Sequence, residues 1–213
     1  MPILGVLTGD VVGSQQIPDK ERLRDVLESA LALIESRFQA RSDRYRGDGF
    51  QVALPTPAQA MTAAVLIRSA LIQESASRQT TWDARIAVAA GEGTLPAEGA
   101  LTDAQGPAFV LSGHCLDALA DTDRRLAVAL PDAFADPALT LLTRFADDII
   151  GGWSRYSAEV AYHSLLHEES QQSLARRLGR AQPTINRRLA AARWPLIRDY
   201  IAFIDQRLSE VEP

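Results

Sequence analysis

Two aspartates stand in glycine-containing turns and are the residues of this chain best suited to chemistry. Asp10 closes the first apolar run, and Asp48 is the centre of a Gly-Asp-Gly turn. Two carboxylates side by side at strand ends form a site for a hard divalent cation. With the carbonyl of Val11 they would hold Mg²⁺ or Mn²⁺. An aspartate beside a glycine is also a common turn cap, and spacing alone favours that simpler role.

The backbone beside these aspartates is suited to an anion. Successive N–H groups in a turn form a concavity that binds phosphate. Metal ions next to such a concavity would be placed for two-metal phosphoryl chemistry on a nucleotide. The residues that we expect to contact the nucleotide are Val12, Gly13, Ser14 and Gly47.

Hydrophobic spacing predicts the elements that carry both aspartates. Helical spacing indicates helices over 18–40 and 55–77, and apolar or alternating runs indicate strands at 2–8, on both sides of Asp48, and at 82–90. The order β-α-β-β-α-β predicts an α+β, ferredoxin-like domain, with an antiparallel four-stranded sheet and its helices on one face. The first strand and the hairpin are neighbours in that sheet, so Asp10 should lie close to Asp48.

The rest of the chain divides into the end of this domain and a helical second part. The pattern predicts a loop at 91–106, a helix at 107–119, a strand at 125–130 and a linker at 131–137. We therefore expect one domain over 1–135 and another over 136–213. The second would contain a helix over 154–168 and a closing amphipathic helix over 196–208.

Residues 171–190 have the pattern of a helix-turn-helix. Apolar residues of its first helix (Leu174, Ala175, Leu178) would pack against Ile185 and Leu189, while Gly179 permits the turn. Residues 170–213 hold eight arginines and four acidic residues, a net charge of +4, whereas the preceding part has a net charge of −9. A basic end on an acidic body predicts an anionic partner for that end. A helical hairpin with a solvated basic face, used for dimerisation, is the alternative.

If the second of these helices enters a major groove, its exposed N-terminal residues would read base edges. The residues in that position are Gln182, Thr184, Asn186 and Arg187. Arginines around them would contact phosphates, and these are Arg176, Arg177, Arg180, Arg188 and Arg193. DNA is therefore the expected partner.

Composition is that of an ordinary globular protein. The 213 residues are 46% hydrophobic and 23% charged. No apolar run approaches the roughly 20 residues that span a bilayer, and no secretory signal peptide is evident. A single cysteine, Cys115, excludes an internal disulfide framework and fits a reducing compartment. We expect a cytoplasmic protein with no membrane partner.

Three short motifs, in this order, resemble those of the class III nucleotidyl cyclase homology domain. They are Asp10-Val-Val-Gly13, Arg46-Gly-Asp-Gly-Phe50 and Arg85-Ile-Ala-Val-Ala-Ala-Gly-Glu92. The chain is still more similar to SatD-type bacterial proteins, which combine segments like 9–14, 47–51 and 106–109 with a C-terminal helix-turn-helix. This resemblance implies a nucleotidyl cyclase-like fold in which the two aspartates bind metal ions.

One segment departs from the cyclase pattern. Cyclases use an Asn and an Arg on the helix after the long loop to stabilise the transferring phosphate. This chain reads Val110-Leu-Ser-Gly-His-Cys-Leu116 there and has neither. We therefore expect a DNA-binding transcriptional regulator whose cyclase-like domain binds a metal or nucleotide without efficient turnover.

The alternative is an enzyme, a metal-dependent nucleotidyl cyclase that acts on a nucleoside triphosphate at Asp10 and Asp48. A homodimer is expected in either case, because operators are usually pairs of half-sites and cyclase-like domains pair face to face.

Overall fold

The computed structural model describes residues 1–45, 47–76, 81–96 and 99–212. Arg46, which belongs to one of the cyclase-like motifs, and Ser77, the predicted end of the second helix, lie outside the described residues.

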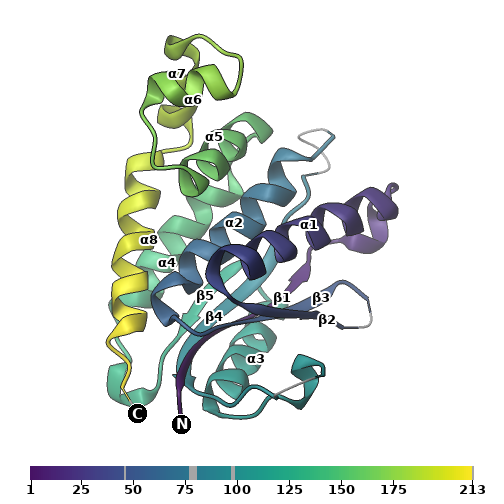
Figure 1. The fold of residues 1–213 in the computed structure, drawn as a ribbon, viewed down its shortest axis with the longest axis vertical. Coiled ribbons are helices and arrows are strands. Elements are labelled where there is room, and N and C mark those ends of the chain that lie inside the picture. The colour runs from purple at the N-terminus through teal and green to yellow at the C-terminus, as the bar shows by residue number, and fades with distance from the viewer. Residues whose placement is uncertain (46, 77–80, 97–98, 213) are drawn as a thin grey trace.

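One five-stranded sheet runs through the described residues (Figure 1). Its strands are β1 (Ile3–Val11), β2 (Arg41–Arg44), β3 (Gly49–Leu54), β4 (Ala84–Glu92) and β5 (Leu126–Ala129). They lie in the order β2-β3-β1-β4-β5, with antiparallel neighbours except for β4 and β5, which run parallel. The α+β class and the β-α-β-β-α-β order of the first four strands are confirmed. The strand predicted at 125–130 is also present, as β5, and it joins the predicted four-stranded sheet as a parallel fifth strand.

The first strand is longer than predicted. Gly9 and Asp10 were expected to form a turn, but β1 continues to Val11 because β3 and β4 pair with it on both sides. Gly9 is required by close packing: a Cβ there would lie 2.5 Å from Phe50 Cζ and 2.7 Å from Arg85 O. The turn expected at Gly9-Asp10 is therefore wrong, and Asp10 is a strand residue.

Eight α-helices surround the sheet in the described part of the chain. They are α1 (Lys20–Phe38), α2 (Ala60–Gln73), α3 (Pro107–Ala120), α4 (Pro137–Gly151), α5 (Arg155–Leu166), α6 (Gln171–Arg177), α7 (Gln182–Ala191) and α8 (Trp194–Ser209). The helices predicted at the positions of α1, α2, α3, α5, α6, α7 and α8 are present, with bounds shifted by a few residues.

Helices cover both faces of the sheet, so the prediction of one covered face is wrong. Leu7 and Phe50 point into the main core with α1 and α2. Leu4 and Val6 point to the other face, where they meet Ala108 of α3. In Figure 1, α3 lies on the opposite side of the sheet from the other helices. The helix over 107–120 becomes a second layer because the strand residues that face it are also apolar.

The C-terminal helices pack on the same core as the sheet. Buried residues of α4, α5, α7 and α8 belong to one cluster with those of α1 and α2. At the N-terminus of α2, the Asp205 carboxylate accepts from the Met61 N–H (2.8 Å) and from the Thr62 hydroxyl (2.6 Å). The buried core therefore crosses residue 135, while the division into two domains stays a prediction.

Helix α4 was not predicted. Asp136 caps its N-terminus by accepting from the Ala138 N–H at 2.8 Å, and Pro137 occupies the first turn. The segment assigned as a linker, 131–137, thus leads directly into a 15-residue helix.

Candidate functional site

The two predicted acidic segments meet at one end of the sheet. The Val11 N–H donates to Asp48 O (3.3 Å), which holds the hairpin tip against the end of β1. The next residue, Val12, donates its N–H to Asp83 O (2.9 Å) just before β4. Gly13 (φ 62°) and Gly47 (φ 93°) both have left-handed backbone conformations that favour glycine. The backbone of the predicted site is therefore assembled as expected.

The Asp10 carboxylate is bound by a residue that sequence reasoning did not assign. Arg85 donates from Nε to Asp10 Oδ1 (3.0 Å) and from Nη2 to Asp10 Oδ2 (2.8 Å). The two residues are opposite each other in the β1–β4 register. Alternation along β1 places Asp10 on the same face as Thr8, whose hydroxyl shares a hydrogen bond with Ser112 of α3 (2.8 Å).

The Asp48 carboxylate has a different partner from that of Asp10. The buried Ser14 donates its hydroxyl to the Asp48 carboxylate. Asp48 lies next to Val11, whose side chain is in the core with α1 and α2. The structure brings the backbones of Asp10 and Asp48 together, but their carboxylates are bound by separate partners.

In this arrangement, the oxygen atoms that were predicted to bind the metal do not form a site for a divalent cation. Both Asp10 oxygens accept from a guanidinium, and Lys20, Arg24 and Arg44 line the cavity beside Asp48. Within the described ranges, no three His, Cys, Asp or Glu side chains are grouped so that they could hold a metal ion. The site of Mg²⁺ or Mn²⁺ at Asp10, Val11 and Asp48 stays a prediction.

The same cavity is better suited to an anion. It has a volume of about 190 Å³ and is lined by residues of β1, α1 and the hairpin, namely Val11, Ser14, Gln15, Lys20, Leu23, Arg24, Leu27, Arg44 and Asp48. Arg44 pairs with Glu28 through Nη1, while its buried Nε has no partner within the described chain. Whole small-molecule ligands usually occupy roughly 300–1,000 Å³. The cavity therefore matches a phosphate group better than an entire nucleotide.

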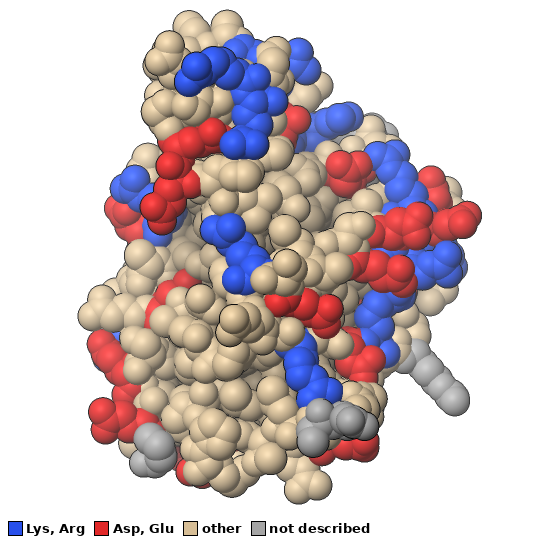
Figure 2. Space-filling model, viewed as in Figure 1, with Lys and Arg blue, Asp and Glu red and all other residues tan. Residues whose placement is uncertain are grey.

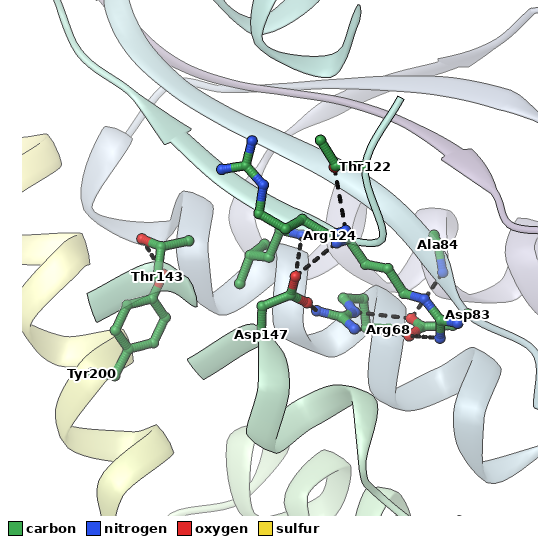
Figure 3. Close-up of polar contacts among 10 residues, drawn as sticks. Arg68, Asp83, Ala84, Thr122, Arg124, Thr143, Asp147 and Tyr200 are labelled. Atoms are coloured by element: carbon green, nitrogen blue, oxygen red, sulfur yellow. Dashed lines mark hydrogen bonds and ion pairs between the residues drawn. The ribbon is translucent and has the colours of Figure 1, made fainter. Parts of the chain in front are cut away.

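A buried charge network lies behind this site (Figure 3). The fully buried Arg68 of α2 donates to both oxygens of Asp83 (2.9 and 2.8 Å) and to Asp147 of α4 (2.7 Å). Arg125 also donates to Asp83 (2.9 Å). Burial acts to lower the pKa of Arg68, but Asp83 and Asp147 outweigh it and raise that pKa above its usual value. Burial likewise acts to raise the pKa of Asp83, yet Arg68 and Arg125 hold it below its usual value.

The network connects the predicted nucleotide turn to the C-terminal helices. Asp83 accepts from Val12 through its backbone carbonyl and from Arg68 through its carboxylate, and Arg68 reaches Asp147 on α4. Sequence reasoning missed this network. Its signal was Arg68 itself, the one charged residue in the stretch 65–71, where all residues are buried and all the others except Ser69 are apolar.

The helices α6 and α7, residues 171–191, form a projecting unit that we call the head (Figure 1). The arginines of the head differ in their partners. Among the described residues, Arg176 and Arg187 are exposed and donate only to the hydroxyls of Ser173 (3.1 Å) and Thr184 (3.5 Å). Gln182, Asn186 and Arg180 are also exposed.

Two more of the predicted DNA-contacting arginines are held by acids. Arg177 donates from Nε to Glu169 Oε1 (2.7 Å). Arg188 pairs with Glu159 of α5, and its guanidinium lies 4.5 Å from the ring centroid of Tyr156. These contacts attach the head to α5 and to the segment before α6.

The fold and site together define an α+β protein with a five-stranded sheet, an anion-suited cavity and a basic helical head. No protein-family model and no curated protein matches the sequence. Similar solved structures include a bacterial light-regulated adenylyl cyclase, with 13% identity, a TM-score of 0.47, and coverage of 59% of this chain and 74% of that chain.

Two further similar structures have comparable scores. An adenylate/guanylate cyclase/hydrolase from Silicibacter pomeroyi has 20% identity, a TM-score of 0.46 and coverage of 62% and 76% of the two chains. The active GGEEF domain of a diguanylate cyclase from Vibrio cholerae has 17% identity, a TM-score of 0.43 and coverage of 59% and 82%. All TM-scores are below 0.5, so we infer no activity from these likenesses. No helix in the described ranges combines the length and apolarity needed to cross a membrane.

Proposed function

We propose that this protein is a DNA-binding regulator whose head contacts DNA and whose sheet domain binds the phosphate of a nucleotide without efficient turnover. The observation that carries the proposal is the exposed basic surface of the head. Arg176 and Arg187 have no carboxylate partner among the described residues, and Gln182 and Asn186 extend from the same N-terminal half of α7.

The packing of the head supports this assignment. Leu174 and Ala175 of α6 and Ile185 and Leu189 of α7 are buried, so the opposite sides of both helices face solvent. Gly179 adopts φ 60° in the connection between them. A second helix presented in this way can enter a major groove by its N-terminal residues, as in helix-turn-helix proteins.

Side-chain chemistry divides the contacts into two kinds. Gln182 and Asn186 carry amides that can bond to an adenine edge, and Arg187 carries a fork that fits a guanine edge. Arg176 and Arg180 are placed for phosphates. Figure 2 shows basic side chains gathered over the head, with acidic ones where the head joins the body. Because Glu169 and Glu159 bind Arg177 and Arg188, these two arginines position the head in our account.

The sheet domain supplies the regulatory half of the proposal. A phosphate in the cavity beside Asp48 would meet Lys20, Arg24 and Arg44. The N–H groups of Gly13 and Ser14 donate to no acceptor in the described chain, whereas Val12 is already bonded to Asp83. Of these two residues, Ser14 lines the cavity, so its N–H group is available for a phosphate there.

Binding to a fluorescent random-sequence DNA duplex, followed by anisotropy, tests the first half. We expect the full-length chain to bind and Arg187→Ala to weaken binding about tenfold or more. The matched control is Arg37→Ala, an exposed arginine on α1 outside both the head and the cavity, which should bind as the wild type does. Equal affinities for wild type and Arg187→Ala would overturn the DNA-binding assignment.

Thermal unfolding with ATP or GTP, with and without Mg²⁺, tests the second half. A ligand that binds only the folded chain raises the melting temperature. We expect stabilisation that Lys20→Ala reduces and Arg37→Ala, at the far end of α1, leaves unchanged. Stabilisation without product supports a regulatory ligand. Formation of a cyclic product that Asp48→Asn abolishes would replace this account with the enzyme alternative.

A further inference from the structure

A large cavity lies between α4 and the segment that leads into β5. It has a volume of about 790 Å³, and sites that hold a whole small molecule usually have roughly 300–1,000 Å³. It shares no lining residue with the cavity beside Asp48. We call it the α4 cleft, and its walls are formed by residues 123–125 and by one side of α4 with the turn after it.

The inner wall of the α4 cleft belongs to the buried charge network (Figure 3). The Asp147 carboxylate accepts from Arg68 Nη1 (2.7 Å) and, through its other oxygen, from the N–H groups of Arg125 (2.7 Å) and Leu126 (3.2 Å). Arg125 in turn donates to Asp83 (2.9 Å). These groups hold one another, so a ligand has to bind through the other residues of the cleft.

Four further charged side chains line the α4 cleft and have no ion pair in the described chain. Arg144 and Asp148 of α4 and Asp123 are exposed, and Arg124 is half-buried. Neither of these arginines lies within ion-pair distance of a carboxylate among the described residues. On α4 the base precedes the acid by four residues, which is the less favourable order for a pair along a helix. The cleft therefore offers both a cation and an anion to a ligand.

An apolar wall completes the α4 cleft. Leu141 and Phe145 line it and are 51% and 62% exposed. Leu141, Arg144, Phe145 and Asp148 follow one another at i, i+3, i+4 and i+7 spacing. One side of α4 therefore presents all four side chains to the cleft. Ligand sites combine apolar walls with a few placed polar groups in the same way.

The signs of the charges indicate the class of ligand. A nucleotide or another polyanion would meet Asp123 and Asp148 beside the arginines, and like charges brought together oppose binding. A zwitterion places its carboxylate against a guanidinium and its ammonium against an aspartate, so it satisfies both signs. A peptide of apolar residues also carries side chains that cover Leu141 and Phe145. A single amino acid would leave much of the cavity empty.

We propose that the α4 cleft is a binding site for a short apolar peptide with free termini. The peptide carboxylate contacts Arg144 and Arg124 in charge-assisted hydrogen bonds. Its ammonium contacts Asp148, and its apolar side chains pack on Phe145. The site uses no residue of the head and none of the cavity beside Asp48, so it stands independently of the proposed function.

Isothermal titration calorimetry of the full-length chain with leucyl-phenylalanine and phenylalanyl-leucine tests the site. We expect the wild type to bind these dipeptides, and we expect an affinity about tenfold lower for Arg144→Ala, because a hydrogen bond between charged groups is lost. Arg37→Ala on α1, outside the cleft, is the matched control and should bind as the wild type does. Circular dichroism establishes that both variants are folded.

Blocked dipeptides identify the group that each side chain contacts. Amidation removes the carboxylate, so the wild type and Arg144→Ala should bind the amidated dipeptides with the same, weaker affinity. Acetylation removes the ammonium, so the wild type and Asp148→Ala should bind the acetylated dipeptides equally. A merely structural effect of either substitution would instead persist with every dipeptide.

The proposal fails in any of three cases. These are no binding of either dipeptide by the wild type at millimolar concentration, equal affinities of the wild type and Arg144→Ala for the unblocked dipeptides, and undiminished binding of dipeptides blocked at both ends. If, in the first case, ATP bound in a manner that depends on Arg144, the cleft would be an anion site. Arg187→Ala should keep the wild-type affinity for the dipeptides whatever its effect on DNA, which separates this site from the function of the head.

Discussion

Arginines of the interior and arginines of the head have opposite environments. Arg68 is fully buried, and three of its N–H groups donate to the carboxylates of Asp83 and Asp147. Arg176 and Arg187 are exposed and have only hydroxyl groups as partners in the described chain. Arginine therefore has two environments in this protein: it pairs with carboxylates in the interior, and it is exposed to solvent on the head.

This difference distinguishes arginines that stabilise the fold from arginines that can bind a ligand. A guanidinium that is fully buried against carboxylates is not accessible to a ligand, and it joins the elements that carry its partners. An exposed guanidinium without a carboxylate keeps its donors for an external anion. In this chain the first kind holds α2, α4 and the sheet together, and the second kind lies on the head.

The largest expected effect on stability comes from removing Arg68 from the buried charge network. Arg68→Met leaves Asp83 and Asp147 buried without their shared partner, and removing one member of a buried ion pair costs about 3–5 kcal/mol. Urea unfolding followed by circular dichroism measures this loss. Arg24→Met on the exposed side of α1 is the control and should cost little. Equal unfolding midpoints for the two variants would contradict the structural role of Arg68.

Asp205 is a buried carboxylate with neutral hydrogen-bond partners, so its pKa should shift in the opposite direction from that of Asp83. Burial raises the pKa of Asp205 from 3.8 to about 7, and hydrogen bonds from Thr62 and the Met61 N–H only partly oppose this. The folded state then binds more protons than the unfolded state in this range. The contribution of Asp205 to stability is full below pH 3.8 and is lost as the pH rises through about 7.

Asp205→Asn removes this dependence. We expect the stability of the wild type relative to Asp205→Asn to fall between pH 4 and 7, by roughly 1.4 kcal/mol for each unit of pKa difference. The measurement is urea unfolding of both proteins at several pH values. Asp199→Asn, on the exposed side of α8, should keep the wild-type profile. A constant difference between wild type and Asp205→Asn would show that Asp205 is ionised throughout this range.

A smaller effect should distinguish the unpaired from the paired arginines of the head. Arg187→Ala should weaken DNA binding by about 1–3 kcal/mol, because it removes the guanidinium that we propose to contact a base edge. Arg177→Ala should weaken it clearly less, since Arg177 is paired with Glu169. Anisotropy titrations of the two variants, made side by side, give the ratio of the two losses of affinity. A larger loss for Arg177 than for Arg187 would reverse our assignment of the two roles.

Periodic patterns predicted most of the fold. The strands and helices of residues 1–120 follow from apolar spacing and from glycine and proline positions, and the neighbouring placement of β1 and the hairpin followed from their order. Helix α4 was missed, although Leu139, Thr143, Ala146 and Ile150 have helical spacing, because the flanking prolines indicated a linker. The layer formed by α3 could not be predicted, since its position depends on the second apolar face of the sheet.

The candidate site was predicted only at the level of the backbone. The approach of Asp10 to the hairpin follows from strand order, but the hold of Arg85 on its carboxylate depends on the β1–β4 register. The partners of Arg68 are 15 and 79 residues away in sequence, so no local pattern connects them. Side-chain pairing across elements requires the three-dimensional structure.

The salt dependence of DNA affinity tests the central claim most directly. Each phosphate contact releases a counterion, so the logarithm of the affinity falls against the logarithm of salt concentration with a slope of about −0.9 per contact. We predict a steep slope for the wild type and a slope shallower by about 1 for each arginine removed in the double variant Arg176→Ala, Arg180→Ala. Identical slopes for the two proteins, or no binding by the wild type at low salt, would contradict the assignment of the head to DNA.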